Sequence, residues 1–494
     1  MPSAYQQLTD VFTRLAHLDH ASTYLTWDQM VMMPEQGIER RSQTLAELAA
    51  LRHAQLSNDA LGDWFDEAQA TATGDTVASV REMRRQWDLS RVLPAELVKQ
   101  QIMAGAKCEH AWRTQREHND WDGFLVNFRE VVALAREEAR IRQSAAPDQF
   151  DTPYDALLDL HCAGDTSELI SEVFTALKAV LPDMISTLSQ RETTGAFNDN
   201  DHYPIEAQKA LSEALMAQLG FDFSAGRLDV SVHPFSTGGR GDARITTRYR
   251  DNEFMDALLA TAHETGHASY ESGLPADWAL LPVGGSRNMS IHESQSLLFE
   301  KQLLLAKPFL AFLTQLIHQH LPDSRQYDAD TLWRHATVVK PSFVRVEADE
   351  VTYPLHVILR YEIESALING DMEPDAIPTV WDEKMQQYLG LSTGNNHKLG
   401  CLQDIHWTDG AFGYFPSYTL GAVNAAQLFH ALTEQHTDWE QRFADGDTSF
   451  VNAWLSEHIW QRGSFLSSQE LMVQATGETT NAQHLINHLR ARYL

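Results

Sequence analysis

The feature that most constrains this chain is a pair of histidines four residues apart, His263 and His267. Positions i and i+4 of a helix lie one above the other, so both imidazoles can meet one metal ion. Glu264 follows the first histidine directly, which places its carboxylate where it can act on water at that metal. Apolar residues recur at helical spacing around the pair, and Asn252 is the predicted N-cap, so the segment is predicted to be a helix.

A second helix is predicted to supply a third metal ligand. The loop after the first helix is broken by prolines and glycines, and a new helix is predicted to open at Ser290 and to carry Glu293. Catalytic zinc sites often use two histidines and one glutamate and leave a fourth position open. The two motifs together therefore predict a metallohydrolase that binds Zn²⁺ through His263, His267 and Glu293.

Composition argues against several other classes of function. The chain has 494 residues, with 38 Lys and Arg against 68 Asp and Glu, a formal net charge of −30. Nucleic acids and anionic membranes are bound by clustered Lys and Arg, which this balance disfavours. The first residues lack the basic and apolar regions of a secretory signal, and the most apolar stretch, residues 303–317, is too short to span a bilayer. Three scattered cysteines predict no disulfide framework. We therefore expect a cytoplasmic protein without a nucleic-acid or membrane partner.

Apolar periodicity predicts a mainly α-helical fold with a small β-sheet near the metal helix. No linker or repeat supports several domains, so we expect a single large body with an active-site cleft, spanning residues 1–494. Within it, residues 1–200 are predicted to form a helical lobe that covers the cleft, and residues 201–494 the metal-binding catalytic part. Residues 227–232 and 243–249 alternate as strands do, around a glycine-rich turn at 236–241. A strand beside such a site can bind an extended peptide.

Two later segments are rich in groups that bind or transfer charge. Residues 339–350 place Arg345 among acidic residues after a proline. Residues 400–418 concentrate His, Asp, Trp and Tyr in a stretch with many turns. From composition alone, both a functional and a purely structural interpretation of the second segment stand.

Six short motifs follow one another in the second half of the chain. They are His-Pro-Phe at 233–235, Asp-x-Arg-x-Thr at 242–246, His-Glu-x-x-His at 263–267, His-Glu-Ser-Gln at 292–295, Pro-Ser-x-x-Arg-x-Glu-Ala-Asp-Glu at 341–350 and Gly-x-x-Gln-Asp-x-His-Trp at 400–407. In this order they resemble the carboxypeptidase Taq family of metallocarboxypeptidases, closely over residues 233–421 and again around Trp27. Ser290, Leu297 and Phe299 stand where the family pattern has Gly, Arg and Trp, and none of them is a predicted ligand.

The resemblance implies a neurolysin-like fold, a homodimer, and removal of single C-terminal residues from peptides with broad side-chain tolerance. One Zn²⁺ is expected per chain, with Co²⁺ or another divalent ion as the alternative. A zinc endopeptidase or a dipeptidyl carboxypeptidase of the same fold is the alternative enzyme. A non-catalytic binding protein is the other alternative, but such a protein needs no general base, whereas Glu264 is present.

Catalytic roles follow from side-chain chemistry and from the resemblance together. Glu264 is predicted to accept the proton of the attacking water and to deliver it to the leaving amine. By similarity to related peptidases, His406 and Tyr418 are predicted to stabilise the oxyanion, with Tyr414 in reserve. A structural role in an aromatic corner is the alternative for both tyrosines.

Arginine suits the bidentate recognition that a terminal carboxylate requires. Arg345 is the first candidate and Arg244 the second, and the alternative for each is an ion pair with an acid that is near in sequence. His233 is a further candidate for substrate binding. The residues predicted to orient the metal ligands are His292, Gln403 and Asp404.

Overall fold

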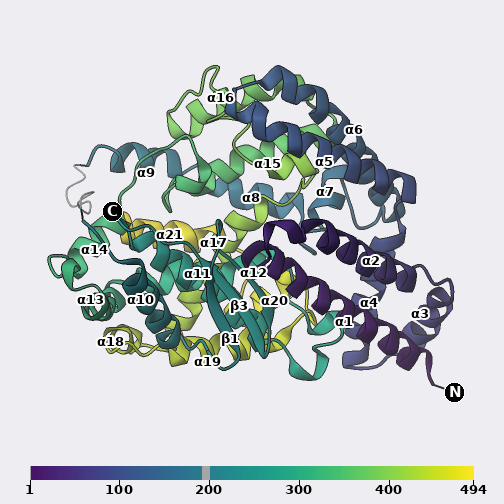
Figure 1. The fold of residues 1–494 in the computed structure, drawn as a ribbon, viewed down its shortest axis with the longest axis horizontal. Helices are drawn as coiled ribbons and strands as arrows, with labels where there is room; N and C mark the ends of the chain where they lie inside the picture. The colour runs from purple at the N-terminus through teal and green to yellow at the C-terminus, as the bar shows by residue number, and fades with distance from the viewer. Residues whose placement is uncertain (1, 192–200) are drawn as a thin grey trace.

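A computed structural model describes residues 2–191 and 201–494 of the chain. The described residues are mostly helical and include one small three-stranded sheet (Figure 1), so the predicted fold class is confirmed. The predicted boundary between two lobes at residue 200 lies outside the described residues. Among the helices that are described, none is both long and apolar enough to cross a membrane.

Up to residue 191, all regular elements that the structure describes are helices. Its elements are α1 (Ala4–Val31), η1 (Glu35–Gly37), α2 (Ile38–Leu56), α3 (Ala60–Thr71), α4 (Asp75–Arg91), α5 (Ala95–Glu117), α6 (Trp121–Ala145), α7 (Pro153–Leu158), α8 (Ser167–Lys178) and α9 (Leu181–Leu188). The apolar faces of α1, α3 and α4 enclose a small core of their own, in which the rings of Phe12, Phe65 and Trp87 pack against one another. In Figure 1 these helices, in purple, form one end of the molecule, and α1 reaches the sheet.

The sheet has the strand order β1-β3-β2 and follows α10 (Ile205–Gln218). Its strands are β1 (Gly226–Val230), β2 (Phe235–Gly239) and β3 (Asp242–Thr247). β1 pairs with β3 in parallel, and β2 pairs with β3 antiparallel after a tight turn in which Gly241 has a φ of 86°. The glycine-rich segment predicted as a turn is therefore largely strand β2. Its glycines weaken the local strand signal, and pairing with β3 overrides it.

The two predicted metal helices are present and directly follow the sheet. They are α11 (Met255–Gly273) and α12 (Met289–Leu297), separated by the short helices η2 (Ala276–Trp278) and η3 (Pro282–Gly284), and α12 continues as the π-helix η4 (Leu298–Leu304). The prediction that Asn252 caps the first helix is wrong, because the Glu253 carboxylate accepts the N–H groups of Met255 and Asp256. Asn288 caps α12 by accepting the N–H of Ile291 at 3.0 Å.

The remaining chain adds helices on both sides of α12. They are α13 (Lys307–His320), η5 (Pro322–Ser324), α14 (Ala329–Ala336), η6 (Arg345–Glu347), α15 (Tyr353–Asn369), η7 (Pro374–Ala376), α16 (Ile377–Leu389), η8 (His406–Asp409), α17 (Pro416–Gln435), α18 (Trp439–Ala444), α19 (Ser449–His458), η9 (Trp460–Arg462), α20 (Ser468–Thr476) and α21 (Ala482–Tyr493). Two large apolar cores result, one around α6 and α15 and one around α11 and α13. α17 contributes buried residues to both cores and packs along α12, so it joins the two parts at the metal helix.

Candidate metal centre and active site

Two glycines allow the helices of the predicted metal site to approach closely. A side chain at Gly266 of α11 would lie 2.5 Å from the carbonyl oxygen of Gln295 on α12. A side chain at Gly421 of α17 would lie 2.6 Å from the side chain of Glu293. α11, α12 and α17 therefore meet at distances that only glycine permits, and the three predicted ligands lie at this junction.

The structure brings the three predicted metal ligands together. His263, His267 and Glu293 each offer one ligand atom, and these atoms all lie within 4.8 Å of one another. The Glu293 carboxylate oxygen lies 3.9 Å from His263 Nε2 and 3.4 Å from His267 Nε2. Two imidazole nitrogens and one carboxylate oxygen at such distances form a donor set that fits a divalent ion such as Zn²⁺.

The other ring nitrogen of each histidine is held by a neighbouring side chain. His263 Nδ1 lies 2.8 Å from Glu300 Oε2, on the π-helix η4. His267 Nδ1 lies 2.6 Å from His292 Nδ1, and His292 Nε2 lies 2.9 Å from Glu271 Oε1. Fixing the Nδ1 atoms leaves both Nε2 atoms directed at the same point, as metal-binding histidines require.

Electrostatics at the site favour a bound cation. Burial lowers the pKa of His263, but the carboxylates of Glu293 and Glu300 outweigh it and raise that pKa to about 10. Burial and the adjacent His292 lower the pKa of His267 to about 4, so its ring is neutral and keeps a lone pair for a metal. Burial alone would raise the pKa of Glu293, yet the two histidines lower it below its usual range. Without a metal, His263 therefore carries a proton that Glu293 and Glu300 stabilise, and a divalent ion can take the place of that proton.

Glu264 lies beside the ligands and is only 7% exposed. Burial raises the pKa of its carboxyl group, while His263 and a hydrogen bond from Ser236 partly offset that rise. Ser236 belongs to β2, so the edge strand of the sheet touches the predicted general base. A carboxylate with a raised pKa accepts and returns a proton more readily at neutral pH than an ordinary glutamate.

His406, Tyr414 and Tyr418 lie together. His406 Nε2 is 3.3 Å from the Tyr418 hydroxyl, and the Tyr414 ring centre lies 5.6 Å from that of His406 and 5.4 Å from that of Tyr418. Burial lowers the pKa of His406 to about 4 and raises that of Tyr414 to about 12. At neutral pH the three groups are uncharged and can donate hydrogen bonds. Tyr418 stands on α17 one turn before Gly421, where α17 touches Glu293.

Arg345 is buried and bound to two side chains, those of Asp404 and Tyr353. Its Nε and one terminal nitrogen donate to Asp404 Oδ1 at 3.1 and 2.9 Å, and its other terminal nitrogen donates to the Tyr353 hydroxyl at 2.8 Å. Asp404 Oδ2 also accepts from Arg360 at 2.7 Å. Two guanidinium groups thus share one carboxylate, which leaves a net positive charge. Gln403 accepts the backbone N–H of Arg345, so Gln403 and Asp404 hold this arginine instead of the metal ligands.

Arg244 lies on the sheet, and His233 lies in the segment between two of its strands. Arg244 on β3 forms a bidentate pair with Asp242, at 2.9 and 3.0 Å, and its guanidinium lies 4.2 Å from the Trp27 ring centre on α1. His233 is exposed in the segment between β1 and β2. Arg244 thus contacts Asp242 and α1 and shares none of the partners of Arg345, and the ion pair foreseen as the alternative for Arg244 is present.

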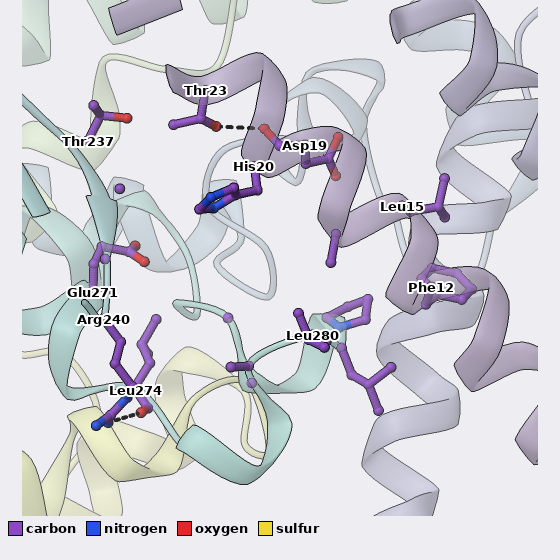
Figure 2. A pocket seen from close by; sticks show the side chains of 18 of the residues that line it. Phe12, Leu15, Asp19, His20, Thr23, Thr237, Arg240, Glu271, Leu274 and Leu280 are labelled. Atoms are coloured by element: carbon purple, nitrogen blue, oxygen red, sulfur yellow. Dashed lines mark hydrogen bonds between the residues drawn. The ribbon is translucent and has the colours of Figure 1, made fainter. Parts of the chain in front are cut away.

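A cavity of about 630 Å³ adjoins the group that orients His267. Its walls come from α1, from β2, from the end of α11 and from the loop that follows α11. Figure 2 shows His20 of α1 and Glu271 of α11 on facing sides, with Thr237 of β2 above Glu271. His292 also lines the cavity, so this space reaches the His292–Glu271 pair behind His267 from the side of the sheet.

Several residues of the site were absent from the sequence-based predictions. Glu271 follows His267 by four residues on α11, and Glu300 follows Glu293 by seven on the next helix, so helical spacing could have identified both. Arg360 contacts Asp404, 44 residues away, and Tyr353 contacts Arg345 from the start of the next helix, and no local pattern marks either residue.

Comparison with known proteins places this geometry in context. A sequence model described as carboxypeptidase Taq (M32) metallopeptidase matches residues 7–493. The chain is 33% identical over 504 aligned residues to Thermostable carboxypeptidase 1 of Thermus thermophilus, covering 99% of this chain and 98% of that protein. It is 32% identical over 503 residues to Carboxypeptidase 1 of Bacillus subtilis, at 99% and 97% coverage.

Solved structures give the same result for the fold. The chain superposes on metallocarboxypeptidase 1 of Trypanosoma cruzi with a TM-score of 0.96 and 38% identity, covering 99% of each chain. It superposes on an M32 carboxypeptidase of Deinococcus radiodurans with a TM-score of 0.94 and 30% identity, covering 99% of this chain and 98% of the other.

Proposed function

The chain belongs to the carboxypeptidase Taq (M32) metallopeptidase family and is a metallocarboxypeptidase by that membership, and we propose that it uses one Zn²⁺ per chain to release single C-terminal residues from peptides. The observation that carries the zinc assignment is the donor set of His263, His267 and Glu293, whose ligand atoms lie within 4.8 Å of one another. A Zn²⁺ ion in that position would lower the pKa of bound water and polarise the scissile carbonyl. Co²⁺ or another divalent ion is the alternative.

In the proposed mechanism this chain's own residues move the proton and bind the developing charge. Glu264 accepts the proton of the attacking water and delivers it to the leaving amine, which its raised pKa supports. Tyr418 and His406, with Tyr414 beside them, donate hydrogen bonds to the oxyanion. Because burial keeps both tyrosines protonated, they can donate throughout the neutral range.

We propose Arg345 as the residue that binds the free carboxylate of the substrate. Asp404 compensates only one of the two guanidinium groups that it contacts, so Arg345 and Arg360 retain a positive charge between them. Arg244, by contrast, is fully paired with Asp242. A charge-assisted pair with a carboxylate is therefore more favourable at Arg345. Further from the cut bond, the peptide can run along the edge strand β2, which lines the cavity of Figure 2.

The decisive experiment compares matched peptides that end in a carboxylate or in an amide. Loss of the charge-assisted pair is worth about 1.5–3 kcal/mol, so kcat/KM is expected to fall roughly ten- to a hundred-fold for the amide. Acetylation of the N-terminus is expected to have little effect. Arg345→Ala is expected to remove the preference for the acid, whereas Arg244→Ala, the matched control, is expected to keep it.

Equal cleavage of acid and amide peptides by the native protein would contradict this proposal. It would favour the alternative, a zinc endopeptidase of the same fold. Mass spectra of the products distinguish the remaining case, because a dipeptidyl carboxypeptidase releases residues in pairs and this protein is expected to release them singly.

We further propose that the protein is a homodimer in the cytoplasm. The dimer is what the family resemblance implies, and light scattering at several protein concentrations tests it. Cys108, Cys162 and Cys401 are all buried and unpaired, which suits a reducing compartment.

A further inference from the structure

Glu364 is a completely buried carboxyl group on α15 that the proposed mechanism does not use. Three groups donate hydrogen bonds to it. The Tyr154 hydroxyl donates to Oε1 at 2.6 Å, the Gly413 N–H donates to the same oxygen at 3.3 Å, and Trp407 Nε1 donates to Oε2 at 3.1 Å. Burying a carboxylate without such donors costs several kcal/mol of folding free energy. The three donors are therefore needed to hold Glu364 in this position.

Two of the three donors flank residues of the proposed active site. Trp407 directly follows His406, and Gly413 directly precedes Tyr414. Trp407 and Gly413 are buried and face Glu364, whereas His406 and Tyr414 are partly exposed. One carboxylate therefore holds the segment from His406 to Tyr414 at both of its ends.

Gly413 adds a steric constraint to the same end of the segment. Its φ is 87°, and a side chain there would lie 2.8 Å from the backbone of Leu158. The chain therefore passes close to α7 at this point, and its N–H is directed at Glu364. At the other end, the Trp407 ring packs between Phe128, Phe412, Phe415 and Trp381.

An amide in place of this carboxylate cannot satisfy the same donors. Burial raises the pKa of Glu364 to about 7, and the donors and Arg360 oppose that rise. In glutamine, one of the two oxygens becomes an NH₂ group. If the NH₂ group replaces Oε1, it opposes the Gly413 N–H, and if it replaces Oε2, it opposes the Trp407 N–H. Either orientation releases one end of the segment, because neither donor can become an acceptor.

We propose that Glu364 is a positioning residue that sets the orientation of His406 and Tyr414 for the reaction. The inference rests on the roles given to those two residues in the proposed function. Displacing a catalytic group by a fraction of an ångström to one ångström weakens transition-state binding much more than substrate binding. The expected signature is a lower kcat at nearly unchanged KM and metal content.

The test is Glu364→Gln, assayed well above the pKa of Glu364 so that the native group is ionised. We expect kcat to fall about ten- to a hundred-fold, with bound metal and KM within about two-fold of the native values. The matched control is Glu362→Gln on the same helix. Glu362 also accepts from three groups, Lys178, Lys384 and Tyr388, but all three lie outside the segment. This variant is expected to lose stability and to keep its kcat.

A second arm separates positioning from general destabilisation. In a protein that already carries His406→Ala and Tyr414→Phe, the further change Glu364→Gln is expected to cost less than about two-fold in kcat, because the groups that it positions are gone. A full additional loss in that background would overturn the inference. An unchanged kcat in the single variant would overturn it as well.

The same set of variants distinguishes this inference from the proposed function. If His406→Ala and Tyr414→Phe reduce kcat and Glu364→Gln does not, the proposed function stands and the positioning role is wrong. If the first two leave kcat unchanged, the proposed roles of His406 and Tyr414 are wrong. Should Glu364→Gln not fold, Trp407→Phe removes the indole donor alone and is expected to lower kcat about three- to ten-fold at unchanged KM.

Discussion

The metal ligands and the proposed substrate-binding residues of segment 345–418, which we call the substrate wall, are held in place by contacts of different range along the chain. His263, His267 and Glu293, with the groups that orient them, all lie between residues 263 and 300 on α11, α12 and η4. The substrate wall depends on hydrogen-bonded pairs that are far apart in the sequence, such as Arg345 with Asp404, 59 residues away, and Tyr154 with Glu364, 210 residues away.

This difference has a functional consequence. Residues on two adjacent helices keep their relative positions as long as the helices pack, so the metal site is expected to behave as a local unit. The substrate wall keeps its shape only while several segments that are distant in the sequence remain docked on α15. We therefore expect changes in the first region to act on metal binding and changes in the second to act on turnover.

The largest expected effect is loss of the metal itself. His263→Ala and Glu293→Ala are each expected to lose bound zinc and to fall to background activity, since two ligands cannot hold the ion against dialysis. Metal analysis of the dialysed proteins measures this, and circular dichroism is expected to show that the helices persist. The exposed His233 offers a control, because His233→Ala is expected to retain its zinc. Full zinc content in both ligand variants would contradict the assignment.

The next effect tests chemistry without loss of the metal. Glu264→Gln preserves the shape of the side chain but cannot accept a proton, so kcat is expected to fall by at least about 10²-fold at unchanged zinc content. A steady-state assay with metal analysis of the same sample measures both. If most of the activity remained, another group would have to activate the water.

The first region could be predicted from the sequence because a helix converts spacing into geometry. His263 and His267 are one turn apart, and a second amphipathic helix carries Glu293, so the ligand set needs little knowledge of the fold. His292 was also predicted correctly as a neighbour of the ligands, since it lies between His267 and Glu271. The mainly helical fold followed from the same periodicity.

The second region could not be predicted in the same way. Asp404 was expected beside the metal ligands, but it binds Arg345 and Arg360, because the docking of residues 400–418 on α15 is decided by tertiary contacts. Glu364 carries no motif at all. The strand β2 was missed for a related reason, since its pairing with β3 outweighs its weak local propensity. The predicted division at residue 200 stays a prediction.

The smallest expected effect sharpens the comparison within the metal region, and it concerns the groups that orient the histidines. Glu300→Gln keeps an acceptor for His263 Nδ1 but removes its charge, so zinc affinity is expected to fall about ten- to a hundred-fold. Glu271→Gln acts on His267 only through His292, one hydrogen bond further away, and is expected to cost less. Competition with a zinc chelator ranks the two variants against the native protein. At saturating zinc, both variants are expected to recover most of the native kcat, because neither residue belongs to the substrate wall. If kcat stayed low although zinc was fully bound, the metal region would not be a local unit. It would instead be coupled to the substrate wall through η4.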